Sequence, residues 1–109
     1  MAKHTIEFHL SSTEDGAILA SVRREHVLPF LTEHPALVRV NGQGLMLAYV
    51  RDFPQREGAV RWASGRMPVI ADELAAAGSA LPSFTPGNIT VVPQFPAVVS
   101  TREDAPIGD

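Results

Sequence analysis

The first residues of the chain alternate between apolar and polar side chains. In HTIEFHL (4–10), the apolar residues Ile6, Phe8 and Leu10 fall on one face of an extended chain. Glu7 and His9 fall on the opposite face. Strict alternation is typical of a strand that is buried on one side. We therefore predict a strand over residues 4–10 whose two faces differ in chemistry.

The next segment leaves two structures open. Ser11 followed by Glu14 has the spacing of a helix-capping box, which predicts a helix through the apolar positions 18, 19, 22 and 26–27. Alternatively, EDG (14–16) is a hairpin turn and AILASV (17–22) is a second strand. The apolar spacing fits the helical period better, so we favour the helix. Pro29 is expected to end or kink it.

A hairpin is predicted after Pro35. ALVRV (36–40) and LMLAYV (45–50) are rich in strand-forming residues, and NGQG (41–44) joins them. The apolar positions 38, 40, 45, 47 and 49 supply its buried side chains. A phosphate-binding loop would lead into the start of a helix, whereas this one leads into a strand. We therefore interpret NGQG as a turn, because asparagine and glycine tolerate the positive φ that hairpin turns require.

The residue pattern in the second half of the chain predicts one helix and one strand. DFPQREG (52–58) is expected to break the structure, and Gly58 and Gly65 weaken a helix between them. PVIADELAAAG (68–78) is the clearest helix of the sequence, with Pro68 in its first turn and Gly78 at its end. NITVVP (88–93) is expected to form the last strand.

The predicted order is strand, helix, strand, strand, helix, strand. This order is typical of an α+β fold, a ferredoxin-like β-α-β-β-α-β two-layer sandwich with the helices on one face of an antiparallel sheet. We expect a single domain over residues 1–92 and an extended, proline-containing C-terminal tail over 93–109. A strand at 17–22 would shift the fold towards mostly β.

Composition narrows the function classes. The chain has 109 residues, 45% hydrophobic and 19% charged, which is typical of one globular domain. It contains no cysteine, which excludes disulfides, thiolate catalysis and sulfur-ligated zinc. The net charge of −3 and the scattered basic residues argue against nucleic-acid binding. With no signal peptide and no apolar run of membrane-spanning length, we expect a cytoplasmic protein that does not bind membranes.

No catalytic or metal-binding motif stands out, and we expect neither a metal nor a cofactor. His4 and His9 point to opposite faces of one strand, so they cannot share a metal. One group of residues offers a catalytic alternative. Glu7 and His9 share the polar face of the first strand, and together with Arg39 they can line an open sheet surface. In a dimer formed sheet to sheet, this surface would become a pocket with a general base and a cation.

The C-terminal stretch is the main candidate for a contact surface. VVPQFPAVV (91–99) is apolar, yet its prolines oppose regular structure beyond residue 93. Such residues either cover the protein's own core or dock on a neighbouring chain as an added strand or arm. The candidate binding residues are Phe84, Val91, Val92, Phe95, Val98 and Val99.

The stretch HPALVRVNGQGL (34–45), which follows a strand and a predicted helix, resembles part of the small effector proteins of multicomponent phenol hydroxylases. It covers 12 of the 109 residues, and the chain lacks the acidic C-terminal segment of that family. The resemblance implies a protein without a cofactor that docks on a hydroxylase.

Two hypotheses result. In the first, the chain is a small non-catalytic accessory, regulatory or assembly protein that binds another protein or copies of itself through the hairpin (36–50) and the C-terminal arm. In the second, it is a small dimeric enzyme or ligand-binding protein of the α+β-barrel type, with His9, Glu7 and Arg39 in a pocket.

Overall fold

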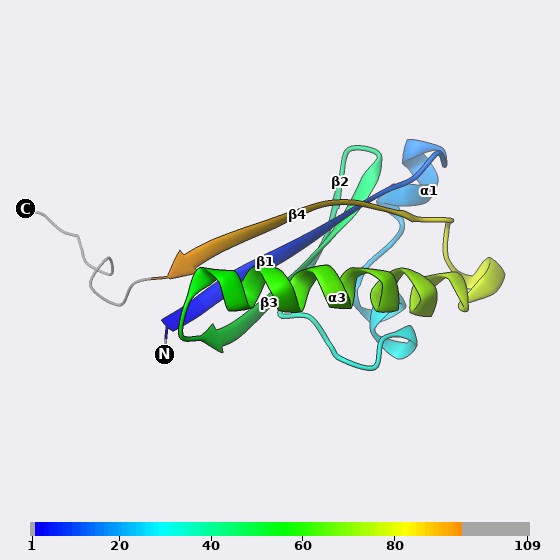
Figure 1. Cartoon of the computed structure of the whole chain (residues 1–109). Helices are drawn as coiled ribbons and strands as arrows, with labels where there is room; N and C mark the ends of the chain where they lie inside the picture. Colours follow the sequence, from blue (N-terminus) through cyan, green and yellow to red (C-terminus); the bar gives the residue numbers. More distant parts are fainter. Residues whose placement is uncertain (1, 95–109) are drawn as a thin grey trace, which may run out of the picture.

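The centre of the fold is a four-stranded antiparallel sheet (Figure 1). A computed structural model describes residues 2–94. The strands are β1 (Ala2–Ser11), β2 (Leu37–Asn41), β3 (Gly44–Phe53) and β4 (Thr85–Gln94). Their order in the sheet is β2-β3-β1-β4, so β1 and β3 lie in the middle. The predicted α+β class is confirmed, as are the four strands and their antiparallel pairing.

The longest helix, α3 (Arg56–Ala75), runs along one side of the sheet (Figure 1). Two short helices, α1 (Gly16–Ala20) and α2 (Arg24–Val27), connect β1 to β2, and a 3₁₀ turn (Leu28–Phe30) follows α2. A second 3₁₀ turn (Gly78–Ala80) leads from α3 towards β4. The 28–30 turn contains Pro29, and Leu31 is already extended, so the predicted end of the helical segment at this proline is confirmed.

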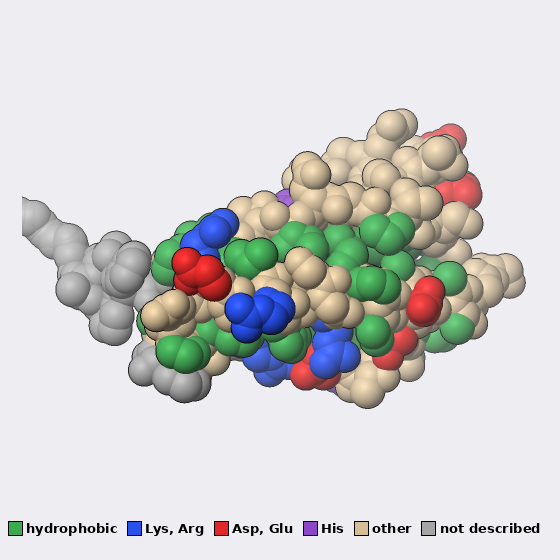
Figure 2. All heavy atoms as spheres, viewed as in Figure 1, with side chains coloured by type: hydrophobic (Ala, Val, Ile, Leu, Met, Phe, Trp, Pro, Cys, Tyr) green, Lys and Arg blue, Asp and Glu red, His purple; other side chains and the backbone are tan. Residues whose placement is uncertain are grey.

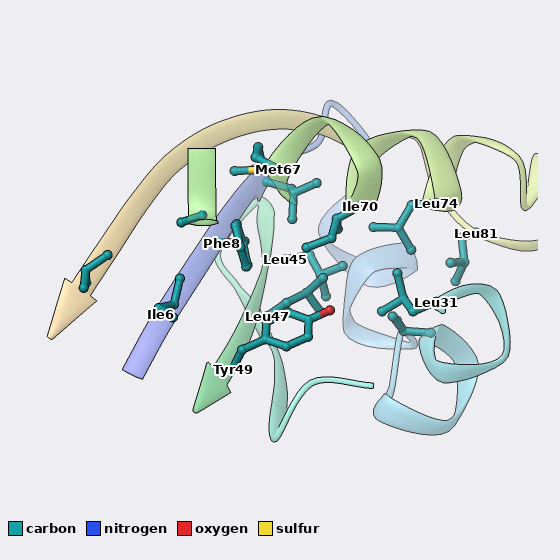
Figure 3. Close-up of a cluster of buried hydrophobic side chains, with 14 of the residues drawn as sticks. Ile6, Phe8, Leu31, Leu45, Leu47, Tyr49, Met67, Ile70, Leu74 and Leu81 are labelled. Atoms are coloured by element: carbon teal, nitrogen blue, oxygen red, sulfur yellow. The ribbon is translucent and has the colours of Figure 1, made fainter. Parts of the chain in front are cut away.

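The core lies between the sheet and α3. Alternate residues of the strands point into it, because side chains of a strand alternate between its two faces. Figure 3 shows the strand side chains, Phe8, Leu45 and Leu47 among them, meeting Ile70 and Leu74 from α3. The predicted inward positions of β1 and of the hairpin are therefore confirmed. We call this side of the sheet the inner face.

The helix after β1 differs from the prediction. Ser11 does not cap it, because Ser11 is still part of β1, where its hydroxyl pairs with that of Thr85 at 2.9 Å. The N-cap is Asp15, whose side chain accepts a hydrogen bond from the Ala17 amide at 2.7 Å. The expected single helix is instead broken between α1 and α2. The alternative strand over 17–22 is not formed.

The second helix is also longer than predicted. Pro68 does not start it; it lies inside α3, thirteenth of its 20 residues. A proline inside a helix costs about 3 kcal/mol. The expected break over 52–58 is short, since β3 extends to Phe53 and α3 starts at Arg56. Residues spaced by three or four positions are buried along the helix and stabilise it despite the proline and two glycines: Ala59, Ala63, Met67, Ile70 and Leu74.

NGQG is a hairpin turn, as predicted. Gly42 has a φ of 62°, which a residue with a side chain rarely adopts. Gly44 serves a different purpose, because a Cβ at this position would lie 2.5 Å from the backbone oxygen of Leu10. The second glycine therefore lets β3 approach the end of β1 closely.

The last strand extends beyond its predicted limits at both ends. β4 begins at Thr85 and runs to Gln94, so Pro93 and Gln94 belong to the sheet and not to a separate tail. Proline is tolerated here because β4 is an edge strand, where only one side of the backbone must pair. The remainder of the expected tail lies outside the described residues.

Candidate interaction surface

The side of the sheet that faces away from the core carries side chains from all four strands, and we call it the outer face. The pairing of the strands places the following residues there: Lys3, Thr5, Glu7, His9, Leu37, Arg39, Asn41, Met46, Ala48, Val50, Asp52, Thr90 and Val92. None of them belongs to the hydrophobic core cluster. The outer face is therefore a surface in its own right, built on the rigid backbone of the sheet.

A large part of the outer face is apolar. Leu37, Val50 and Val92 are 39%, 40% and 47% exposed. Met46 and Ala48 lie between them on the central strand β3 and are themselves nearly buried. Leu37 of β2 pairs with Ala48 of β3. Thr5 of β1 lies between Val50 of β3 and Val92 of β4. Several exposed apolar side chains on one face are typical of interaction surfaces.

Sequence reasoning predicted the polar residues Glu7, His9 and Arg39 of this face but not the apolar residues of the hairpin that lie beside them. It assigned the apolar positions 38, 40, 45, 47 and 49 of the hairpin to one buried face and left the others unexplained. A signal was present, because LMLAYV (45–50) is apolar at every position. A continuous apolar run of this length is typical of a strand that is covered on both faces.

The structure brings two of the three candidate catalytic residues together. Glu7 Oε1 lies 3.2 Å from His9 Nε2, and both side chains are about one-third exposed. Arg39 is on the same face but on β2, opposite Met46, which in turn pairs with His9. The prediction that the three residues share a face is confirmed. The recess beside His9 is not lined by Glu7 or Arg39.

A β-bulge lies beside His9. The register of β1 against β4 shifts between Phe8 and Leu10, so that Gly87 and Asn88 both lie near His9. A Cβ at Gly87 would be 2.6 Å from the His9 backbone oxygen, so this close approach requires glycine. A shallow recess of about 330 Å³ adjoins His9 at this end of the sheet, between the bulge and the hairpin turn. Bulges commonly redirect a side chain in this way.

The predicted contact residues of the C-terminal stretch are divided between the faces. Val91 is 8% exposed and belongs to the core, and Phe84 packs against that core. Val92 is the only one of the three described residues that points to the outer face. Phe95, Val98 and Val99 lie outside the described residues. Only Val92 therefore presents its side chain to a partner within the described part of β4.

The helix side of the molecule offers a less continuous apolar surface. Figure 2 shows this side, on which apolar and charged side chains are mixed. Val60 and Val69 of α3 are 36% and 40% exposed. Exposed charged residues such as Arg61 and Asp72 lie next to them along the helix. Single exposed valines in charged surroundings are normal for a protein surface.

An open cleft of about 440 Å³ lies between the α1–α2 segment and the loop that follows α3. Glu14 and His26 are its ionisable residues, and Ser21, Ser79 and Ser83 add hydroxyl groups. No hydrogen bond or ion pair links Glu14 to His26 among residues 2–94. The cleft therefore has polar walls but no assembled pair of catalytic groups.

A charged cluster at the edge of the inner face has a structural role. Glu33 Oε2 is 2.6 Å from Arg51 Nη2, and Glu33 Oε1 is 3.3 Å from Arg66 Nη2, close enough for an ion pair but outside hydrogen-bond geometry. Both guanidinium groups stack on the Trp62 ring, at 5.5 and 5.6 Å. Because its charges are paired with one another, the cluster fastens the loop before β2 to β3 and α3.

Tyr49 joins this cluster from the inner face. Its hydroxyl donates a hydrogen bond to the Glu33 backbone oxygen at 3.1 Å. Burial, followed by the negative charge of Glu33, raises the pKa of Tyr49 to about 12. The tyrosine therefore stays neutral at physiological pH and acts as a buried hydrogen-bond donor.

The histidines do not form a metal site. His4 is buried on the inner face, where its ring meets Phe53 edge to face, whereas His9 is on the outer face. The predicted separation of the two histidines is confirmed. Across residues 2–94 no group of three His, Asp or Glu side chains is arranged to hold a metal ion.

Within the same residues, no helix combines the length and the apolar character needed to cross a membrane. In comparisons with models of protein families, with curated proteins and with solved structures, no match to this chain was found.

Proposed function

We propose that this chain is a non-catalytic binding module that works through protein–protein contact at the outer face of its sheet. The observation that carries the proposal is the exposure of Leu37, Val50 and Val92 on the face opposite the core, where Met46 and Ala48 adjoin Leu37 and Val50. Burying this surface against a partner removes apolar area from water, which favours association by about 25 cal/mol per Å² before the costs of binding.

The hairpin and β4 contribute to this surface as neighbours in one sheet. The outward residues of the hairpin are Leu37, Arg39, Met46, Ala48 and Val50. Val92 extends the surface to the edge strand β4, and the C-terminal arm continues the chain from there. An accessory, regulatory or assembly role fits a rigid sheet that presents such a patch. An effector protein of a hydroxylase is one member of this class, suggested by the resemblance of residues 34–45 alone.

We further infer that the fold is a ferredoxin-like two-layer sandwich. The order of strands and helices along the chain agrees with that arrangement. Each of the two helical connections, β1 to β2 and β3 to β4, skips one strand of the sheet, as a split β-α-β unit requires.

The proposed function is tested by recovering the tagged full-length chain from its source cells and weighing the complexes by native mass spectrometry. Val50→Glu places a charge in the centre of the outer face. Val69→Glu is the matched control, because both valines are 40% exposed and Val69 lies on α3. We expect the wild type and the control to carry a stoichiometric protein subunit, which Val50→Glu loses. The proposal is contradicted if both variants recover the same amount of the bound subunit, or if the wild type recovers none.

A second candidate function, a small-ligand-binding or catalytic protein, is favoured by the Glu7–His9 contact at 3.2 Å on the same face. A carboxylate that orients an imidazole is a common general-base arrangement. In this case a small ligand raises the melting temperature of the wild type, and His9→Ala removes this shift without changing the mass of the assembly. If no ligand from a broad panel stabilises the protein, the second candidate fails.

A further inference from the structure

We propose that the partner of the outer face is a second copy of this chain, and that the two sheets pack face to face around a two-fold axis along β3. The inference rests on the proposed function and identifies the protein that the outer face binds. Three observations support it: an unpaired arginine, the position of the acid–histidine pair, and the apolar character of β3 on both faces.

Arg39 is a cation without a partner. It forms no hydrogen bond or ion pair with any other residue between 2 and 94, and its neighbour across the strands is the apolar Met46. The nearest acid–base pair on that surface is Glu7–His9, which is on β1. β3 separates β1 from β2, so their backbones are about 10 Å apart, which is two strand spacings. Among residues 2–94, no ion pair joins Arg39 to Glu7 across this separation.

A two-fold axis that runs along β3, parallel to the strands, brings Arg39 of one copy close to the Glu7–His9 pair of the other. Rotation about the axis places β2 of one copy over β1 of the other, because these strands flank β3 on its two sides. Arg39 of each copy then lies opposite His9 of its partner, whose ring is 3.2 Å from the Glu7 carboxylate of that partner. The contact forms twice, as a symmetric dimer requires. Each copy thus supplies the cation that the Glu7–His9 pair of the other lacks.

The residues on the axis suit a close approach of two sheets. Met46, Ala48 and Val50 point outward from β3 and meet their own counterparts. Packed sheets lie about 10 Å apart, and small or apolar side chains at the centre permit that distance. Leu37 joins the contact from β2. None of these three positions carries a charge that would face its own copy. Asp52, the next outward residue of β3, lies at the end of the strand, where Lys3 pairs with it at 3.7 Å.

The expected dimer is small. Only β2, β3 and β1 overlap in this arrangement, so the planar footprint is on the order of 400 Å² per copy. This places the interface at the lower end of specific ones, and we expect a dissociation constant in the micromolar range. β4 extends past the overlap, and Val92 lies at the rim.

The inference is tested by sedimentation equilibrium of the full chain from about 1 to about 300 µM, a range that brackets the expected constant. The wild type is expected to dimerise. Arg39→Glu and Glu7→Arg each weaken the dimer at least about tenfold, since each places like charges opposite one another. The double variant exchanges both charges and restores the affinity to within about threefold of the wild type. If the two losses of dimer affinity simply add in the double variant, and the affinity is not restored, the inference is overturned.

Cross-linking supplies a test that does not depend on charge. Because the chain has no cysteine, Val50→Cys and Val69→Cys each introduce a single thiol at equal exposure. A thiol-reactive cross-linker about 10 Å long is expected to join two copies through position 50, which lies on the axis, and not through position 69. Equal cross-linking at both positions overturns the proposed geometry, as does its absence at position 50.

The outcomes separate this inference from the proposed function. A wild-type chain that stays monomeric up to the highest concentration overturns the second copy as partner. If that monomer binds a different protein and Val50→Glu abolishes the binding, the proposed function stands alone. If the wild type binds neither itself nor another protein, both are wrong. Circular dichroism of each variant verifies that the sheet is intact.

Discussion

The two faces of the sheet are built from the same strands, yet they differ in what covers them. On the inner face, the side chains of β1 and β3 meet α3 and are buried, Phe8 and Leu47 completely. On the outer face, His9, the residue after Phe8, is partly exposed, and Val50, three residues after Leu47, is 40% exposed, whereas Met46 and Ala48 are nearly buried. The backbone is identical for both, so the difference arises from the helices, which cover one face only.

This comparison shows how a strand can serve stability and recognition at once. Successive side chains of a strand point in opposite directions, so one set can be committed to the core while the other remains free to meet a partner. Substitutions at adjacent positions should therefore have very different effects on the free energy of unfolding.

The largest expected effect is that of Phe8→Ala. Phe8 is fully buried and its ring contacts those of Tyr49 and Trp62, at 5.5 and 5.9 Å between centroids. Removing a buried phenylalanine costs about 3–5 kcal/mol, because the side chain leaves a cavity. The neighbouring His9→Ala should cost less than about 1 kcal/mol, since it removes only a partly exposed pair with Glu7. Urea unfolding of both variants measures the difference, and equal losses would contradict the division of the two faces.

A smaller effect is expected from pH, through Tyr49 on the inner face. Its pKa of about 12 in the folded protein exceeds the usual value of 10, so the unfolded chain loses this proton first as the pH rises. The stability that Tyr49 contributes is complete below pH 10 and is lost between about pH 10 and 12. We expect a decrease of up to about 2 kcal/mol over this range.

Tyr49→Phe provides the control for this pH dependence. The variant should unfold more easily at neutral pH by about 1 kcal/mol, because it lacks the hydrogen bond to the Glu33 backbone. Above pH 10 its stability should fall less steeply than that of the wild type. A wild type and a variant with parallel pH profiles would show that Tyr49 does not titrate in this way.

The smallest expected effect on stability is that of Val91→Thr, and Val92→Thr is its closely matched control. These neighbours are 8% and 47% exposed, and valine and threonine have nearly the same shape. At position 91 the new hydroxyl enters the core, which costs about 1–2 kcal/mol. At position 92 the change should be close to zero. Thermal unfolding of the two variants tests whether β4 divides its side chains as β1 and β3 do.

Local patterns were sufficient to predict much of this fold. Alternation in HTIEFHL identified β1 and its inner face, and the glycines of NGQG identified the hairpin turn. These features depend on neighbouring residues alone, because side-chain alternation and positive φ are local properties of the backbone. The same locality explains why Glu7 and His9 were correctly assigned to one face.

Other elements depended on contacts between distant residues. Pro68 and two glycines indicated a helix that starts late, but the packing of Ala59, Ala63 and Met67 on the sheet stabilises α3 from residue 56 onward. Val91 was expected either to cover the core or to meet a partner, and the structure places it in the core. Burial against a distant element outweighs local propensity in both cases.

The sequence by itself determined the α+β class, the four strands, the hairpin and the face on which each polar residue of β1 lies. Only the tertiary structure decided that β3 separates Arg39 from the Glu7–His9 pair, and that Leu37, Val50 and Val92 lie on the same face as Met46 and Ala48. The physical reason is that strand order and register join residues far apart in the chain. No periodicity within a single strand reports which strands become its neighbours.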